Sequence, residues 1–395
     1  MSTRKMGNIH FSRRGSAMPL VAVICPVLFA FAALSVDVGA LYDAKAELQR
    51  CADAAALAGA GALIDERRLR NDGGMNLEID FAVRHTAQEY VQRNRVLGAS
   101  PTVHLNTSNS LGGDLVLGTL SDPTNYHEPL SVGNPDEFNS VRVCVRRDPK
   151  RNGPVGLFFA QIFGRYTANV QAAATATIED GVVGYSGGPN SGTAQLMPFA
   201  LHVDVWNALL AGTTPVGDQY AYDPDTGEVE SGSDTLLEIN MYPGGGIDQL
   251  TPGNFGTVDI GGSNNSTADI ERQIRDGISA EDLAYHGGEL KLGDDGTLTL
   301  TGDTGLSAGF KDALESIIGQ PRAIPLFSSV AGPGDNAEFV IVGFAGIRIM
   351  HVRLTGAPEH KHVIVQRADV VDGTVITEPG STSSYTVYHT PRLTR

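Results

Sequence analysis

The sequence predicts an α+β protein. An N-terminal transmembrane helix continues into a long amphipathic helix, which packs on a mixed α/β domain and is followed by a β-rich second domain. Three observations predict this class: an uncharged apolar run over residues 16–36, an alanine-rich helical pattern directly after it, and short alternating segments in the remaining chain. The chain has 395 residues, enough for two domains, and its 47 glycines and 20 prolines favour turns and strands over a helical bundle.

Residues 1–15 form a basic tail, and the apolar run over residues 16–36 is long enough to cross the hydrocarbon core of a bilayer. Four cations precede the run, Arg13 and Arg14 among them, and no acidic residue comes before Asp37. Because basic residues stay on the cytoplasmic side, we expect the N-terminus inside and the chain after Asp37 outside.

The formal net charge of the whole chain is −16. Since residues 1–36 contribute only cations, the part of the chain after the apolar run is more acidic still. Phosphate binding needs a basic face, so this composition argues against a nucleic-acid partner.

The apolar run has two alternative interpretations. Ala30-Phe31-Ala32 fits the small-x-small pattern of a cleaved secretory signal, and specialised processing near Gly15 is a second possibility. The run is longer than the apolar region of a typical signal, and helical patterning continues beyond the cleavage motif without a break. We therefore expect an uncleaved anchor.

The helical pattern continues from Asp37 to Leu63, where apolar side chains recur at spacings of three and four residues. The small residues on or beside this stripe allow another element to approach closely; they are Ala55, Ala58, Gly59 and Ala62. The stripe fits either the protein's own domain or a partner helix, and these four positions are the surface most suited to a partner.

The first extracytoplasmic domain is expected over residues 37–180. Its pattern predicts a second helix over 77–97 and strands near 102–106, 114–120, 139–147 and 170–178. A short helix over 154–163 is expected to place Phe158, Phe159 and Phe163 in the core, with contact to a membrane surface as the alternative.

Residues 181–194 are rich in Gly and Ser and predict a linker. A β-rich C-terminal domain is expected over 195–376, with Trp206 as a core residue beside a short helix, and a polar tail over 377–395. The apolar segment 338–354 carries two arginines and many β-branched residues, so it predicts two strands or one bulged strand and no second span.

The sequence offers little chemistry. Cys51 and Cys144 could form a disulfide in an oxidising compartment, but two free thiols are the preferred interpretation. His360 and His362 lack a third metal ligand, the acidic segment 223–230 is best explained as a hairpin turn, and Ser307 fits a helix start better than a nucleophile. We therefore predict no catalytic, cofactor or metal residue, no cofactor, and no enzyme activity; the alternative is a secreted hydrolase that uses Ser307.

The segments Val36-Asp37-Val38-Gly39, Leu41-Tyr42, 46–49 and 52–60 resemble the N-terminal segment of TadG-like proteins of Flp (Tad) pilus assembly. The resemblance implies a non-enzymatic, single-pass protein of the bacterial inner membrane with a periplasmic or extracellular bulk. It also implies a role as a minor pilin-like or anchoring subunit. Its partners would be the lipid bilayer and other pilus-assembly or pilin-like membrane proteins, reached through the N-terminal helix.

One residue departs from the pattern of processed pilins. Pilins that a prepilin peptidase processes carry Glu at the fifth position after the cleaved Gly, whereas Leu20 stands fifth after Gly15. We therefore expect no pilin-type cleavage. The alternative function is a periplasmic or surface-exposed binding or adhesion protein that uses its β-rich domain.

Overall fold

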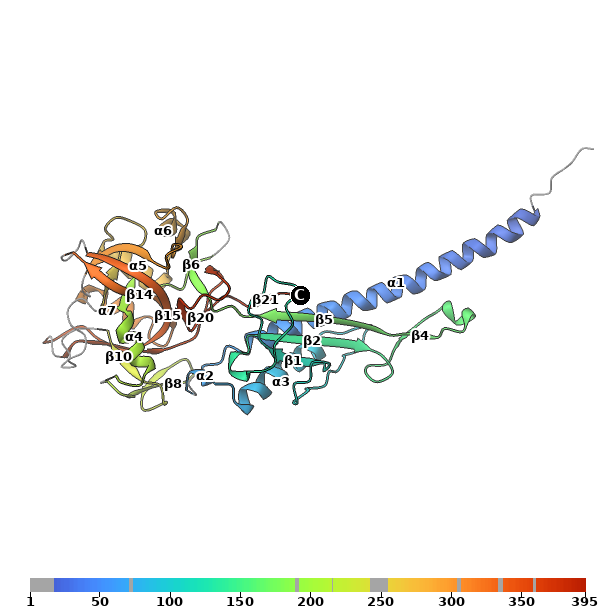
Figure 1. Cartoon of the computed structure of the whole chain (residues 1–395), viewed down its shortest axis with the longest axis horizontal. Helices are drawn as coiled ribbons and strands as arrows, with labels where there is room; N and C mark the ends of the chain where they lie inside the picture. The colour runs from blue at the N-terminus through green and yellow to red at the C-terminus, as the bar shows by residue number, and fades with distance from the viewer. Residues whose placement is uncertain are drawn as a thin grey trace, which may run out of the picture.

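A computed structural model describes residues 18–70, 74–188, 192–214, 216–241, 255–303, 307–332, 337–357 and 360–395. Arg13 and Arg14 lie outside these ranges. The molecule is elongated: one long helix protrudes at one end, a four-stranded sheet lies in the middle, and a β-rich body lies at the other end (Figure 1). The predicted α+β class is confirmed.

Helix α1 (Met18–Gly61) runs for 44 residues without interruption and contains Pro26. At 1.5 Å per residue it is about 65 Å long. Its first half is exposed, whereas from Asp37 onward a buried or half-buried residue recurs every three or four positions. The predicted continuation of the apolar helix into an amphipathic one is therefore confirmed.

The first domain is a four-stranded sheet in the order β1-β2-β5-β21, with α1 packed along β5 and β2. Side chains of different size face each other in its core, because Val141, Val143 and Val145 pair with the smaller Ala176, Ala174 and Ala172. The strands are β1 (Leu115–Gly118), β2 (Ser140–Arg147), β5 (Val170–Thr177) and β21 (Arg392–Leu393).

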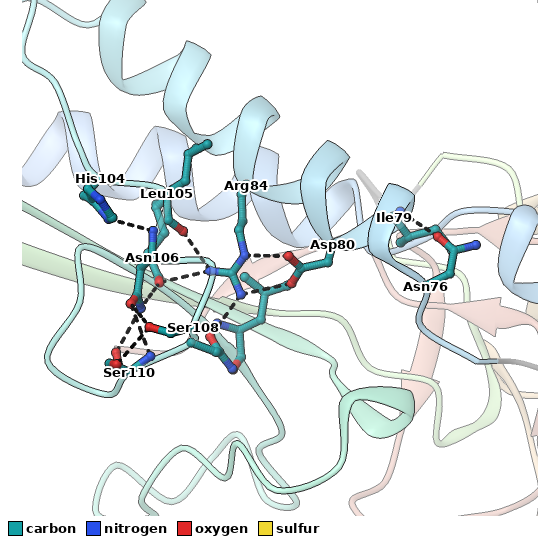
Figure 2. A network of polar contacts seen from close by, with 12 residues as sticks. Asn76, Ile79, Asp80, Arg84, His104, Leu105, Asn106, Ser108 and Ser110 are labelled. Atoms are coloured by element: carbon teal, nitrogen blue, oxygen red, sulfur yellow. Dashed lines mark hydrogen bonds and ion pairs between the residues drawn. The ribbon is translucent and has the colours of Figure 1, made fainter.

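Helix α3 (Leu77–Arg93) packs beside α1, and the one-turn helix α2 (Arg67–Arg70) precedes it. The side chain of Asn76 caps α3 by accepting a hydrogen bond from the Ile79 N–H. Figure 2 shows how Arg84 of α3 binds Asp80 and reaches the loop that contains Leu105.

The predicted strand near 102–106 is wrong. The Leu105 carbonyl accepts from the guanidinium of Arg84, and the Asn106 N–H donates to His104 Nδ1 (Figure 2). These side chains take the backbone groups that a neighbouring strand would otherwise bind, so the segment is an irregular loop.

The predicted helix over 154–163 is also wrong. Strands β3 (Val155–Gly156) and β4 (Thr167–Ala168) form a hairpin whose tip contains the short 3₁₀ helix η2 (Ala160–Phe163). Phe158, Phe159 and Phe163 are exposed, so their expected place in the core is wrong as well.

The second domain contains five strands that close on themselves, because β14 pairs with both β7 and β15. Closure leaves these strands without a free edge. The five are β7 (Phe199–His202), β11 (Phe255–Val258), β13 (Leu298–Asp303), β14 (Pro321–Ala331) and β15 (Ala337–Arg353), and the sheet is extended by β16 (His362–Arg367), β10 (Glu238–Asn240) and β19 (Ser384–Tyr385).

Of the two alternatives predicted for the most apolar segment after α1, two strands or one bulged strand, β15 is the second, since its pairing shifts register against both β14 and β16. Trp206 is fully buried on α4, as predicted. The helices of this domain are α4 (Val203–Leu210), α5 (Thr267–Asp276), α6 (Ala280–Ala284) and α7 (Lys311–Glu315), and the remaining 3₁₀ turns are η1 (Pro135–Glu137) and η3 (Ala308–Phe310).

Three smaller sheets complete the fold. Residues 182–186, expected in a linker, form a strand, and the expected polar tail contributes strands to three different sheets. The strands are β6 (Val182–Ser186), β12 (Glu289–Lys291) and β18 (Val375–Thr377) in one sheet, β17 (Val370–Val371) and β20 (Val387–Tyr388) in another, and β8 (Tyr220–Tyr222) and β9 (Val229–Ser231) in the third. The boundary between domains near residue 195 stays a prediction.

Candidate membrane-anchoring site

Among the residues that the structure describes, one helix is long and apolar enough to cross a membrane, and it is α1. Residues 18–36 are exposed, apart from the half-buried Ala33, and carry no charge. Large apolar side chains such as Phe29 and Leu34 therefore face outward along a protruding helix. Such a surface is stable against hydrocarbon rather than water.

The buried carboxylate of Asp37 marks the end of this apolar half. Its Oδ1 accepts from the backbone N–H of Phe158 at 2.7 Å, and its Oδ2 accepts from the N–H groups of Phe159 at 3.0 Å and Ala160 at 2.7 Å. Desolvation raises the pKa of Asp37, but these three N–H groups outweigh it and hold the pKa below its ordinary value. An ionised Asp37 therefore ties the hairpin tip to α1.

The hairpin tip and α1 enclose a groove of about 570 Å³. Phe159, Ile162 and Phe163 line it from the hairpin side, and the helix contributes residues as far back as Pro26. Pro26 lies about 16 Å before Asp37 along the helix axis. The hairpin tip thus lies beside the apolar half of α1 as well as beside Asp37.

Beyond Asp37 the helix is fixed to the first sheet by polar side chains as well as by its core face. Lys45 donates to the Gln171 carbonyl, and Gln49 Nε2 donates to the Ala173 carbonyl at 3.1 Å. Both acceptors belong to β5. The direction in which α1 leaves the domain is therefore set by the sheet.

The four predicted helix-packing residues do not lie in one environment. Ala55 and Gly59 are buried in the core of the first domain, and Ala58 and Ala62 are half-buried. A Cβ atom at Gly59 would lie 3.0 Å from Val141 Cγ1 and 3.2 Å from Ala87 Cβ. The close approach at Gly59 thus serves β2 and α3 of the same chain.

Cys51 and Cys144 are both buried free thiols. The Cys51 Sγ donates to the Val91 carbonyl of α3 at 3.5 Å, and burial raises the pKa of this thiol to about 11. Cys144 alternates on β2 with the valines that face α1, so its side chain points to the opposite face of the sheet. The bridge that the sequence left open is not formed, for this geometric reason.

The residues that could bind a metal or act as a nucleophile do not come together in one site. Within the described residues no group of three or more His, Cys, Asp or Glu side chains could hold a metal ion. His362 Nε2 lies 2.7 Å from Nδ1 of His351 on the neighbouring strand, whereas His360 is exposed. Ser307 caps η3 by accepting from the Gly309 N–H, as expected for a helix start.

Sequence reasoning missed the link between Asp37 and the hairpin. The available signal was the position of Asp37 as the first charged residue after the apolar run. Its three hydrogen-bond donors lie more than 120 residues further along the chain, and no local pattern indicates that pairing.

Comparison with known families gives two matches, which together cover residues 15–176. The family described as Flp pilus-assembly TadE/G-like matches residues 15–62. The family described as Tad-like Flp pilus-assembly matches residues 58–176, which contain α3, the hairpin and nearly all of the first sheet. No curated protein and no solved structure matches the chain. Over residues 15–176 the chain is therefore similar to the TadE/G-like families of Flp pilus assembly.

Proposed function

We propose that this protein is a non-enzymatic, minor pilin-like or anchoring subunit of a Flp-type pilus. It crosses the inner membrane of a bacterium once, with its N-terminus in the cytoplasm. The observation that carries the proposal is the unbroken helix α1, whose first half is apolar and exposed while its second half is part of a domain core. Such a helix holds the extracytoplasmic domains at a fixed angle to the bilayer.

A partner helix would contact the outward face of α1. Ala55 and Gly59 are occupied within the chain, but Val38, Tyr42 and Ala46 are exposed and recur at helical spacing. This face follows the membrane segment directly along the same helix. It is the surface that we propose for contact with other pilus-assembly or pilin-like membrane proteins.

The orientation is tested with single cysteines and a thiol reagent that does not cross membranes. Gly133 is exposed and a Cβ there would meet no atom within 4 Å, so Gly133→Cys should preserve the fold. We expect Gly133→Cys to be labelled in intact spheroplasts and Ser2→Cys only after permeabilisation. Wild-type protein, with two buried cysteines and Cys25 on α1, gives the background. The reverse labelling pattern would refute the proposed orientation.

The role in the pilus is tested by shearing filaments from cells and fractionating the membranes. An anchoring subunit stays in the membrane fraction, and a minor pilin-like subunit is also recovered with sheared filaments. Deleting the gene should abolish pili in either case. Normal pili in the deletion strain would contradict the proposed function.

A further inference from the structure

The tip of the β3–β4 hairpin, residues 157–166, exposes a cluster of large apolar side chains that the fold does not use. Phe158 is 71% exposed, Ile162 79% and Phe163 78%, and Tyr166 is also exposed. These residues sit on a projection that extends from the sheet in the direction in which α1 leaves the domain (Figure 1). Contiguous apolar surface of this kind marks contact with another phase or molecule.

The position of this hairpin tip is fixed relative to the bilayer through Asp37. Three backbone N–H groups at the start of η2 donate to the carboxylate that ends the uncharged segment of α1. The tip also lines a groove with residues of α1 as far back as Pro26, well inside the segment proposed to span the membrane. If α1 crosses the bilayer, the hairpin tip must lie at the depth of the outer leaflet, on the side where α1 leaves the membrane at Asp37.

We propose that residues 157–166 insert into the outer leaflet and form a second membrane contact beside α1. The inference rests on the proposed membrane anchoring. Phe158, Ile162 and Phe163 enter the boundary between headgroups and acyl chains, where aromatic side chains are favoured. Arg165 and Tyr166, both exposed, lie on the chain returning to β4 and face the headgroups.

Asp37 acts as a positioning residue in this arrangement. Its carboxylate accepts hydrogen bonds from three N–H groups that would otherwise be unpaired near hydrocarbon. Two points of contact, the helix and the hairpin, restrict rotation of the domain about the α1 axis. A single helix would leave that rotation free.

Depth-dependent quenching of fluorescence by brominated lipids tests the proposal in the full chain. Purified Phe163→Trp protein is reconstituted into vesicles of phosphatidylethanolamine and phosphatidylglycerol that carry bromine either near the headgroup or near the methyl end of the acyl chains. The native Trp206 is buried in the second domain, so vesicles with wild-type protein supply a constant fluorescence background. Tyr126→Trp is the matched control: Tyr126 is similarly exposed, and it lies near the C-terminal Arg395 at the far end of β5.

We expect the added emission of Phe163→Trp to be lost mainly with bromine near the headgroup, and that of Tyr126→Trp to be unchanged. Unquenched Phe163→Trp in protein that resists alkaline extraction would overturn the hairpin contact and leave the membrane anchor standing. Emission that is shifted to the blue but not quenched would overturn it in favour of a protein partner, such as a second copy. Protein extracted by alkali would overturn the proposed anchoring, and the hairpin contact with it.

Discussion

Two arginines on α3 allow a sharp test of what holds the first domain together. Each forms an ion pair with an acid four residues earlier on the helix, Arg84 with Asp80 and Arg93 with Glu89. The Arg84 side chain is 1% exposed, whereas that of Arg93 is 62% exposed. The two ion pairs have the same residue types and spacing, but Arg84 is buried and also donates to backbone carbonyls, whereas Arg93 lies at the surface.

Arg84 has a complete set of acceptors. Its Nε and Nη2 donate to Asp80 at 2.8 and 2.9 Å, and its Nη1 donates to the Leu105 carbonyl at 2.9 Å (Figure 2). Nη1 also donates to the Leu115 carbonyl at 3.2 Å. Arg84→Met keeps the aliphatic stem and removes every donor. Because removing one partner of a buried pair costs about 3–5 kcal/mol, we expect a loss of that size. Arg93→Met should cost less than about 0.5 kcal/mol.

The assay is hydrogen–deuterium exchange of the full chain in detergent, followed on peptides from α3 and β2, since these elements report the first domain alone. A thermal melt of that domain should shift by about 2–4 °C per kcal/mol. If the unfolding free energies of Arg84→Met and Arg93→Met differ by less than about 1 kcal/mol, the buried network does not stabilise α3.

Three further outcomes follow from contacts described above. Gly59→Val should destabilise the first domain by about 1–3 kcal/mol through overpacking against Val141. The control is Gly61→Ala, whose added Cβ meets only Pro391 Cγ at 3.8 Å. It should change the unfolding free energy derived from hydrogen exchange of α3 by less than about 1 kcal/mol. Glu66→Ala removes the carboxylate that binds Arg348 at 2.6 and 3.0 Å. It should lower the free energy of unfolding by about 2–4 kcal/mol in urea unfolding followed by Trp206 fluorescence. Glu78→Ala, at an exposed position, should have no effect, and equal losses of stability in the two variants would contradict a role for the pair of Glu66 and Arg348. Burial and the nearby Glu66 raise the pKa of Asp369 to about 7, so its protonated form stabilises the fold below its unfolded pKa and this contribution is lost as pH rises through about 7. The melting temperature should therefore fall between about pH 4 and pH 7, and Asp369→Asn should make that fall shallower; an unchanged slope would exclude Asp369 as its source.

The elements with a strong local pattern were predictable from the sequence. The absence of charge over residues 16–36 and the helical spacing after Asp37 predict α1, and the alternation of Val141, Val143 and Val145 predicts β2. The same rules fail where distant side chains decide the backbone. Arg84 takes the Leu105 carbonyl and prevents a strand, and Asp37 takes the N–H groups that begin η2.

The closure of the second domain could not be predicted either. It depends on the parallel pairing of Leu201 with Leu326, two residues far apart in the chain with no turn or crossover motif that joins them. The candidate site shares this property, because the aromatic cluster at 158–163 has the same spacing whether it is core or surface. Only its attachment to α1 distinguishes the two.

The placement of β21 has a mechanical consequence. The chain leaves the first sheet at Thr177 and returns beside it at Arg392, so two covalent crossings connect the distal body to neighbouring strands. A pull on that body along the long axis of the molecule acts lengthwise on β5, whose eight residues all pair with β2 (Figure 1). Those bonds must shear together instead of unzipping singly, and α1 lies along the same strand. Tension on the distal body is thereby transmitted through β5 to α1.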